Sequence, residues 1–271
     1  MSIAIRSLAR LTRPSDLRTI LARTMSTELK KPLELYSAST PNGQKATVFL
    51  EELKQIYPAF DYHVNEIDIQ KNEQKEEWFL KINPNGRIPA LVDPNRGDHA
   101  VWESAAILLY LEKHYDPDHK FSFGDSADED NFRSEILQWM FFVHGGIGPM
   151  QGQAVFFSKY APEQIPYAIK RYQDETKRLY SVLDTRLRNR DYLVGPGRGK
   201  YSIADANALP WVFWSPFAGI DHVEIPTGVK AWLDRNLERE PTMRGLKVGP
   251  NTSSDMIEQI KKYGALPPST K

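Results

Sequence analysis

The fold is decided by a short stretch near the end of the first third of the chain, Asn83-Pro-Asn-Gly-Arg-Ile-Pro-Ala-Leu91. Its first four residues form a turn signal, because asparagine, proline and glycine each favour turn conformations. Pro89 then leads into a strand candidate, which is unusual inside a sheet because proline cannot donate to the ladder. A cis Ile88–Pro89 bond would turn the peptide groups of Ile88 outward. We therefore expect a strand whose entrance is open to pairing with an extended peptide ligand.

Strand and helix candidates alternate on both sides of this stretch. After the first strand, Thr40 can cap a helix, Pro41 can start it, and Pro58 disfavours its continuation beyond Tyr57. The predicted order is strand 33–36, helix 41–57, strand 61–67, short helix 76–80, strands 88–92 and 100–102, and a helix from Ser104. A parallel pair of strands joined through a helix, followed by a hairpin, predicts an α/β sandwich.

The sequence changes character after these elements. Residues 117–130 are polar and acidic, and we interpret them as a linker between domains. Beyond them, apolar residues recur at helical spacing, and Ser202 and Asp205 form a start signal that resembles a capping box, so this part is predicted to be all-helical. The predicted organisation is an N-terminal extension at 1–30, an α/β domain at 31–116, the linker at 117–130 and a helical domain at 131–271.

The first 25 residues have a composition of their own. They hold five arginines and a single acid, Asp16, together with several serines and threonines. An arginine-rich, serine-rich and acid-poor amphipathic segment is typical of a mitochondrial transit peptide, and a plain N-terminal tail is the alternative. Met25 could also act as a second start site for a cytosolic form. The expected location is therefore cytoplasmic or mitochondrial.

The composition excludes several classes of function. The chain of 271 residues has zero formal net charge and no cysteine. A neutral total does not indicate a nucleic-acid-binding surface, and no run approaches the roughly 18 apolar residues of a membrane span. Disulfides, thiolate metal sites and a cysteine nucleophile are excluded, and the six scattered histidines predict no metal site. Any thiol used in the chemistry must come from a ligand.

Two further segments have the properties of binding elements. Ser39–Gln44 lies at a strand-to-helix junction, where backbone N–H groups and polar side chains can face a ligand, and a simple capped helix start is the alternative. Trp102-Glu103-Ser104 is the second segment, and it lies at the start of another helix that follows a strand. Its hydroxyl and free backbone donors suit a carboxylate, although the same pattern also makes an ordinary N-cap.

Taken in order, these segments resemble the glutathione transferase superfamily from about Leu33 to about Lys247. The resemblance includes Asn85-Gly-Arg-Ile-Pro-Ala-Leu91, Glu103-Ser-Ala-Ala-Ile-Leu-Leu-Tyr-Leu111 and Ser202-Ile-Ala-Asp-Ala-Asn-Ala-Leu-Pro-Trp211. The stretches Thr40–Lys45, Gln138–Phe142 and Gly148–Met150 are further similar to the fungal Ure2p-like class and the related bacterial Nu-type enzymes. The resemblance implies a thioredoxin-like N-terminal domain followed by a C-terminal helical bundle, a homodimer, and glutathione as cosubstrate without another cofactor.

The resemblance also assigns positions in the binding site. Within the run Arg87-Ile88-Pro89, the backbone of Ile88 would pair with the cysteine of glutathione. Glu103 and Ser104 would hold the γ-glutamyl end. Gln74 aligns with a position that contacts glutathione in relatives, where a relative can carry histidine.

Asn42 is the residue that the resemblance places opposite the glutathione thiol. A free thiol has a pKa near 8.5, whereas the nucleophile is the thiolate. The side-chain N–H of Asn42 can donate to the sulfur while the helix end adds positive potential. We therefore expect Asn42 to stabilise the thiolate and not to act as a base. The hydroxyls of Tyr36, Ser39 and Thr40 are the alternatives.

The expected function is transfer of glutathione to an electrophile or reduction of an organic hydroperoxide. Glutathione-dependent disulfide-bond reduction and a non-catalytic glutathione-binding regulator are the alternatives. The second substrate is expected between the two domains, against the helix that begins near Phe132. The candidates for that wall are Phe141, Phe142, Pro149 and Phe156.

Overall fold

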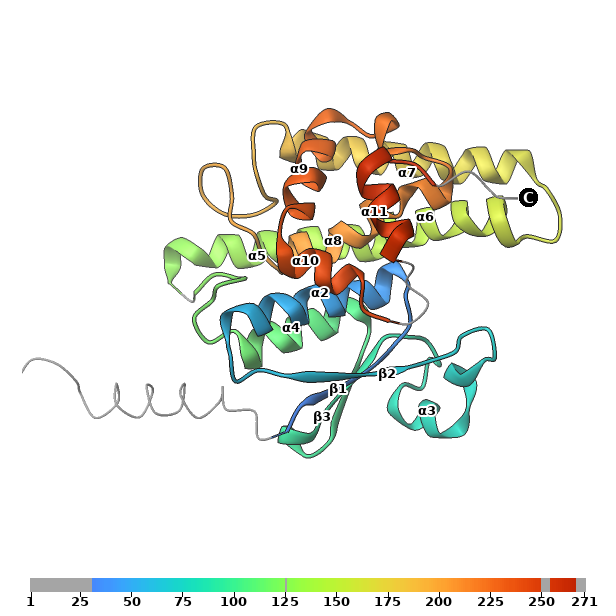
Figure 1. The fold of residues 1–271 in the computed structure, drawn as a ribbon. Helices are drawn as coiled ribbons and strands as arrows, with labels where there is room; N and C mark the ends of the chain where they lie inside the picture. The colour runs from blue at the N-terminus through green and yellow to red at the C-terminus, as the bar shows by residue number, and fades with distance from the viewer. Residues whose placement is uncertain (1–30, 125, 250–253, 267–271) are drawn as a thin grey trace, which may run out of the picture.

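The computed structural model describes residues 31–124, 126–249 and 254–266. The predicted N-terminal extension, residues 1–30, lies outside this part of the chain. None of the helices in these ranges combines the length and the apolar character that a membrane span requires. A sheet domain is followed by a helical domain (Figure 1), which confirms the fold class predicted from the sequence.

The N-terminal domain is built on a four-stranded mixed sheet with the order β2-β1-β3-β4. β1 (Leu33–Ser37) pairs in parallel with β2 (Tyr62–Glu66) and antiparallel with β3 (Ala90–Asp93), which pairs antiparallel with β4 (His99–Trp102). In this register Leu35 lies opposite both Val64 and Leu91. The parallel pair needs the crossover helix α2 (Pro41–Ile56), whereas the short turn η2 (Pro94–Arg96) suffices between β3 and β4.

Alternating side chains give the sheet two apolar faces. Leu35 and Leu91 belong to the main core, which they share with residues of α2 and α4 (Ser104–Tyr115). Tyr36 and Ala90 belong to a separate cluster with Phe79 of α3 (Glu77–Ile82), the helix that follows the short turn η1 (Glu73–Lys75). The pleat therefore turns one face of the sheet toward the helical domain and the other toward α3.

The helical domain begins with a long, nearly continuous helical stretch. α5 (Ala127–Phe142) runs through the π-helical segment η3 (Val143–Ile147) into α6 (Gly148–Val155) and a second π-helical segment, η4 (Phe156–Tyr160). The further helices are α7 (Pro166–Leu187), α8 (Ile203–Phe213), α9 (Thr227–Leu237), α10 (Glu240–Leu246) and α11 (Ser254–Tyr263), with the short turns η5 (Ser215–Ala218) and η6 (His222–Glu224). α8 is buried along its length and begins at a capping box of Ser202 and Asp205.

α5 begins at Ala127, inside the predicted linker 117–130. Its first turn holds Asp128, Glu129 and Asp130, and negative charge is favourable at a helix N-terminus. Acidic residues that suggest a linker in the sequence are thus part of a helix start. The domain limits themselves stay a prediction.

Helix α2 lies between the sheet and the helical domain (Figure 1) and bonds directly to α10. Thr47 Oγ1 donates to the carbonyl O of Gly245 at 2.7 Å, and Gln44 Nε2 donates to that of Leu246 at 2.8 Å. Glu52, only 1 % exposed, accepts two hydrogen bonds from Arg239, at 2.8 and 2.6 Å. α2 therefore has polar contacts to the second domain in addition to its apolar contacts to the first.

Candidate functional site

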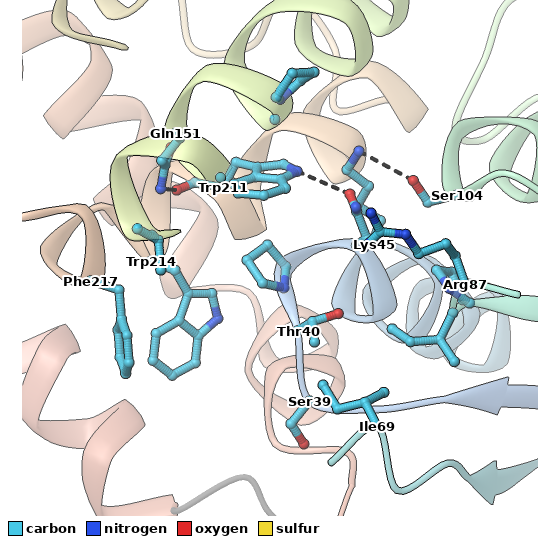
Figure 2. A pocket seen from close by; sticks show the side chains of 18 of the residues that line it. Ser39, Thr40, Lys45, Ile69, Arg87, Ser104, Gln151, Trp211, Trp214 and Phe217 are labelled. Atoms are coloured by element: carbon cyan, nitrogen blue, oxygen red, sulfur yellow. Dashed lines mark hydrogen bonds between the residues drawn. The ribbon is translucent and has the colours of Figure 1, made fainter. Parts of the chain in front are cut away.

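A cavity of about 880 Å³ lies where the two domains meet (Figure 2). Ligand pockets usually have volumes of about 300–1,000 Å³, so this one is near the upper end of that range. Its walls come from the N-terminus of α2, the segment before β3, the N-terminus of α4, the stretch from η3 to η4, and the end of α8 with η5. These include the three segments that the sequence analysis singles out.

The N-terminus of α2 carries Asn42 into the cavity wall. Thr40 caps the helix, because its Oγ1 accepts a hydrogen bond from the backbone N–H of Gly43 at 3.2 Å. A Cβ at Gly43 would lie 2.3 Å from the carbonyl O of Ala38, so glycine is required there. Asn42 Oδ1 accepts a hydrogen bond from Trp211 Nε1 at 3.1 Å, drawn as a dashed line in Figure 2. Because the amide oxygen is held by Trp211, the NH₂ group is the part of Asn42 that can serve a ligand.

The three hydroxyl alternatives to Asn42 differ in position. Tyr36 is not among the residues that line the cavity, since its ring packs on the α3 face against Trp78 and Phe79 with centroid separations of 6.0 and 6.4 Å. Burial raises the pKa of Tyr36. Ser39 and Thr40 do line the cavity, but the Thr40 hydroxyl is engaged as the helix cap.

The segment before β3 is held by Asn83, a buried side chain. Its Nδ2 donates to the carbonyl O of Arg87 at 2.6 Å, and its Oδ1 accepts from the backbone N–H of Asn85 at 3.0 Å. Gly86 adopts a φ of 61°, a region that favours glycine, and the Ile88–Pro89 bond is cis. The predicted turn thus leads Arg87, Ile88 and Pro89 together along the cavity wall.

Glu103 and Ser104 lie where β4 passes into α4. Glu103 has a φ of 71°, which is uncommon for a residue other than glycine, and such backbone strain is concentrated at functional sites. Its Oε2 lies 3.0 Å from Nε2 of His144 in η3, so the helical domain contributes to this corner of the cavity. In the sequence His144 is one of six scattered histidines, and only the packing of the domains brings it here.

Lys45 of α2 is a cavity residue that the sequence analysis misses. It is 1 % exposed, and its Nζ donates to Ser104 Oγ at 3.3 Å (Figure 2). Burial lowers the pKa of Lys45 to about 7, and the negative charge of Glu103 acts in the opposite direction. Lysine is almost never fully buried, so its position on a helix does not reveal this role.

Three predicted binding residues are not among those that line the cavity. Gln74 lies near the loop after β2, with Nε2 3.5 Å from the carbonyl O of Ile69. Phe141 is 68 % exposed because α5 turns it toward solvent, and Phe142 packs on the ring of Trp139 at a centroid separation of 5.6 Å. Helical spacing alone does not show that the helical domain lines the cavity only from His144 in η3 onward, after the end of α5.

The aromatic wall of the cavity comes mainly from α8 and η5. Trp211, Trp214 and Phe217 line it from these elements, and the rings of Trp214 and Phe217 lie 5.3 Å apart between centroids. Pro149 and Phe156, both predicted for the second substrate, line it from α6 and η4. The cavity thus has a polar corner at the N-termini of α2 and α4 and an aromatic part beside it.

Comparison with known proteins gives matches in both domains. Family models for the glutathione S-transferase N-terminal and C-terminal domains match residues 31–113 and 147–240. Disulfide-bond oxidoreductase YfcG of Escherichia coli is 43 % identical over 218 residues, which cover 79 % of this chain and 94 % of that protein.

Two solved structures extend the comparison. A glutathione transferase homolog from Lodderomyces elongisporus, with two GSH per subunit, has a TM-score of 0.70 and 38 % identity and covers 81 % of this chain and 100 % of its own. The glutathione transferase URE2P8 from Phanerochaete chrysosporium, with oxidized glutathione, has a TM-score of 0.71 and 35 % identity and covers 81 % of this chain and 95 % of its own.

Proposed function

Because this chain belongs to the glutathione S-transferase family and is similar to its Ure2p-like members, we propose that the cavity binds glutathione as the thiol substrate of an enzyme. The γ-glutamyl end lies at Glu103 and Ser104, where the N-terminus of a 12-residue helix favours a carboxylate. The cysteine lies beside Ile88, and its sulfur faces Asn42. Arg87 and Pro89 complete the wall of this subsite.

The hydrogen bond from Trp211 to Asn42 is the observation that carries this proposal. It orients the amide so that Nδ2 can donate to sulfur, close to the positive end of α2. A hydrogen bond to an ionised group stabilises it by about 1.5–3 kcal/mol, and each pKa unit by which the thiol is lowered corresponds to about 1.4 kcal/mol. Asn42 therefore increases the thiolate fraction without accepting the proton, which leaves to solvent.

The activated thiolate attacks an electrophilic second substrate against the aromatic wall. With a carbon electrophile, a carbon–sulfur bond forms and the leaving group departs with the bonding pair. With an organic hydroperoxide, the sulfur takes the terminal oxygen, an alcohol is released, and a second glutathione reduces the sulfenic acid to give glutathione disulfide and water. Trp211, Trp214, Phe217 and Phe156 are the residues that we assign to this second site, with Pro149 beside them.

Reduction of a glutathione mixed disulfide is a second candidate function. The bound thiolate attacks the glutathione sulfur, a new disulfide joins the two glutathiones, and the other thiolate leaves and takes a proton. Three observations favour it: the similarity to the Escherichia coli disulfide-bond oxidoreductase, the two GSH per subunit in the Lodderomyces structure, and a cavity near the upper end of the usual size. The chain has no cysteine, so both sulfurs of the product come from ligands.

Assays with an aryl halide, cumene hydroperoxide and a glutathione mixed disulfide test the proposal. We expect turnover with at least one of them, and the relative kcat/KM values decide which reaction dominates. Binding of glutathione without turnover of any of the three would indicate a non-catalytic glutathione-binding protein instead.

The role of Asn42 is tested by Asn42→Ala, with Tyr36→Phe as the matched control. Loss of a hydrogen bond to the thiolate should lower kcat/KM by roughly ten- to a hundredfold and raise the kinetic pKa of bound glutathione, with a much smaller change in its Kd. Tyr36→Phe should leave both quantities nearly unchanged, since its ring lies on the α3 face. The assignment would be wrong if Tyr36→Phe abolished activity while Asn42→Ala did not.

A further inference from the structure

Among the described residues, no carboxylate forms an ion pair with a lysine that is buried at the wall of the cavity. Lys45 is 1 % exposed, and within residues 31–124, 126–249 and 254–266 its ammonium contacts the neutral hydroxyl of Ser104 and forms no ion pair. The nearby carboxylate of Glu103 is 3.0 Å from His144 and is engaged there. Buried charges in proteins are normally paired, because an unpaired charge loses its hydration without compensation.

The charged and titratable groups of the described chain that share the cavity with Lys45 come from four other segments. Arg87 precedes β3, Glu103 opens α4, His144 belongs to η3 and Tyr160 ends η4. Glu103 favours the charged form of Lys45, but burial outweighs it and lowers the pKa of the lysine to about 7. Near neutral pH, a large part of the empty protein therefore holds Lys45 as the neutral amine.

We propose that Lys45 is the counter-ion of the α-carboxylate in the γ-glutamyl group, and that it takes up a proton when this carboxylate enters. This inference rests on the proposed function, because it uses the position of the γ-glutamyl end at Ser104. The ammonium then donates to the carboxylate beside the Ser104 hydroxyl and the N-terminus of α4.

Proton uptake makes the affinity for the γ-glutamyl group depend on pH. A bound carboxylate favours the charged lysine and so raises its pKa above about 7. Between the free and the bound pKa, binding takes up a proton, and affinity falls as pH rises. Thiolate formation changes in the opposite direction with pH. Together, the loss of the lysine charge and the formation of the thiolate as pH rises give kcat/KM a maximum between the pKa of Lys45 and the pKa of the glutathione thiol.

The test is calorimetric titration with S-methylglutathione at pH 8, in buffers of different ionisation enthalpy. This ligand has no thiol, so release of the thiol proton does not contribute. Wild-type protein should take up most of one proton on binding, whereas Lys45→Met should take up much less and bind at least tenfold more weakly. Lys54→Met, on the same helix but exposed, should match the wild type.

Each outcome separates this inference from the proposed function. No binding of S-methylglutathione by the wild type would refute the glutathione site itself. Binding with the same proton count in wild type and Lys45→Met would overturn the role of Lys45 and leave the glutathione site standing. Lys45→Arg serves if the methionine variant does not fold, because arginine stays charged at pH 8. Lys45→Arg should bind S-methylglutathione with little uptake of protons. If it took up as many protons as the wild type, the proposal would be overturned.

An analogue without the α-carboxylate, γ-aminobutyryl-S-methylcysteinylglycine, tests whether this carboxylate is the group that Lys45 contacts. It should bind to the wild type without the proton uptake that depends on Lys45. It should also lose little further affinity in Lys45→Met, because the group that Lys45 faces is already missing. A full proton uptake with this analogue would show that Lys45 responds to another part of the ligand and would contradict the assignment.

Discussion

An amide side chain such as Asn42 can turn either its oxygen or its NH₂ group toward a sulfur atom, and only the NH₂ group stabilises a thiolate. Trp211 decides between the two by donating its indole N–H to Asn42 Oδ1. The backbone carbonyl of Trp211 in turn accepts from Gln151 Nε2 at 2.7 Å, and Gln151 Oε1 accepts from the hydroxyl of Tyr180 at 2.6 Å. A buried chain of hydrogen bonds therefore fixes the side of α8 that faces Asn42.

Trp211→Phe keeps an aromatic ring in this place and removes the donor. We expect kcat/KM to fall roughly two- to tenfold, the value of one neutral hydrogen bond, and the kinetic pKa of bound glutathione to rise. In an Asn42→Ala background the same change should have little further effect, because the group that it orients is absent. Independent effects of the two substitutions on the kinetic pKa would show that Trp211 does not act through Asn42.

At the residue scale, the sequence could predict residues that line the cavity where these are neighbours in the chain. Glu103 and Ser104 are neighbours at a helix start, and Arg87 to Pro89 form one continuous run, so the motifs contain them. Lys45 ends the stretch Thr40–Lys45 without any local sign that it is buried, and His144 is one of six scattered histidines, so both come to the cavity through tertiary packing. No pattern within one segment can show such contacts.

A glycine, Gly245, allows α10 to cross very close over α2. A Cβ at Gly245 would lie 2.4 Å from the Cα of Val48 and 2.6 Å from its backbone N. Both atoms are backbone, so neither can rotate away, and α10 must shift to admit a methyl group.

Gly245→Ala should therefore lower the free energy of unfolding by about 1–3 kcal/mol, the usual cost of overpacking a core. Chemical denaturation with an unchanged m-value would measure it. Gly145→Ala is the matched control, because a Cβ at Gly145 has no atom within 4 Å beyond its own immediate neighbourhood. Equal stability of the two variants would mean that α10 moves freely on α2, contrary to the packing described.

At the element scale, helices and strands could be predicted because the spacing of their apolar residues is regular. Some of their ends could not, because the same residue types occur both in helix caps and in loops. The acids Asp128 to Asp130 fit both a solvated linker and the first turn of α5. Helical spacing also gives no position relative to the other domain: no residue of α5 lines the cavity, and Phe141, which is predicted for its wall, is largely exposed.

The two domains are also joined by a partly buried ion pair. Glu52 of α2 accepts from two nitrogens of Arg239 at the start of α10, and the guanidinium lies 4.0 Å from the ring centroid of Tyr201. Because the Arg239 side chain is 28 % exposed, its charge keeps some hydration when Glu52 is lost, and the cost is below the roughly 3–5 kcal/mol of a fully buried pair.

Glu52→Gln should therefore destabilise the whole molecule by about 1.5–3 kcal/mol, the value of hydrogen bonds to a charged group. Both domains should lose structure in one transition, because the pair lies between them. Thermal unfolding followed by far-UV circular dichroism and tryptophan fluorescence would measure this. Glu77→Gln, which changes an exposed pair with Lys81, should shift the midpoint little. Two separate transitions in Glu52→Gln, or no loss of stability, would contradict a shared cooperative unit.

At the scale of the whole molecule, the order of the two domains could be predicted from the change in sequence pattern, but the surfaces that meet could not. Gln44, Thr47 and Glu52 are polar, and on an isolated amphipathic helix they would face water. They are buried because α10 supplies a partner for each of them. The homodimer stays a prediction, since it concerns a partner chain.

Helix α2 also sets a limit on recombining this chain with its relatives. The connection after α4, where the sheet domain ends, looks like a natural place to join the front half of one protein to the back half of another. A chimera made there would keep Gln44, Thr47 and Glu52 from one parent and receive the α10 backbone and the arginine position from the other. The first domain and the α10 surface that covers α2 must therefore come from the same parent. Parts of family members can be exchanged only when the residues on both sides of this contact fit each other.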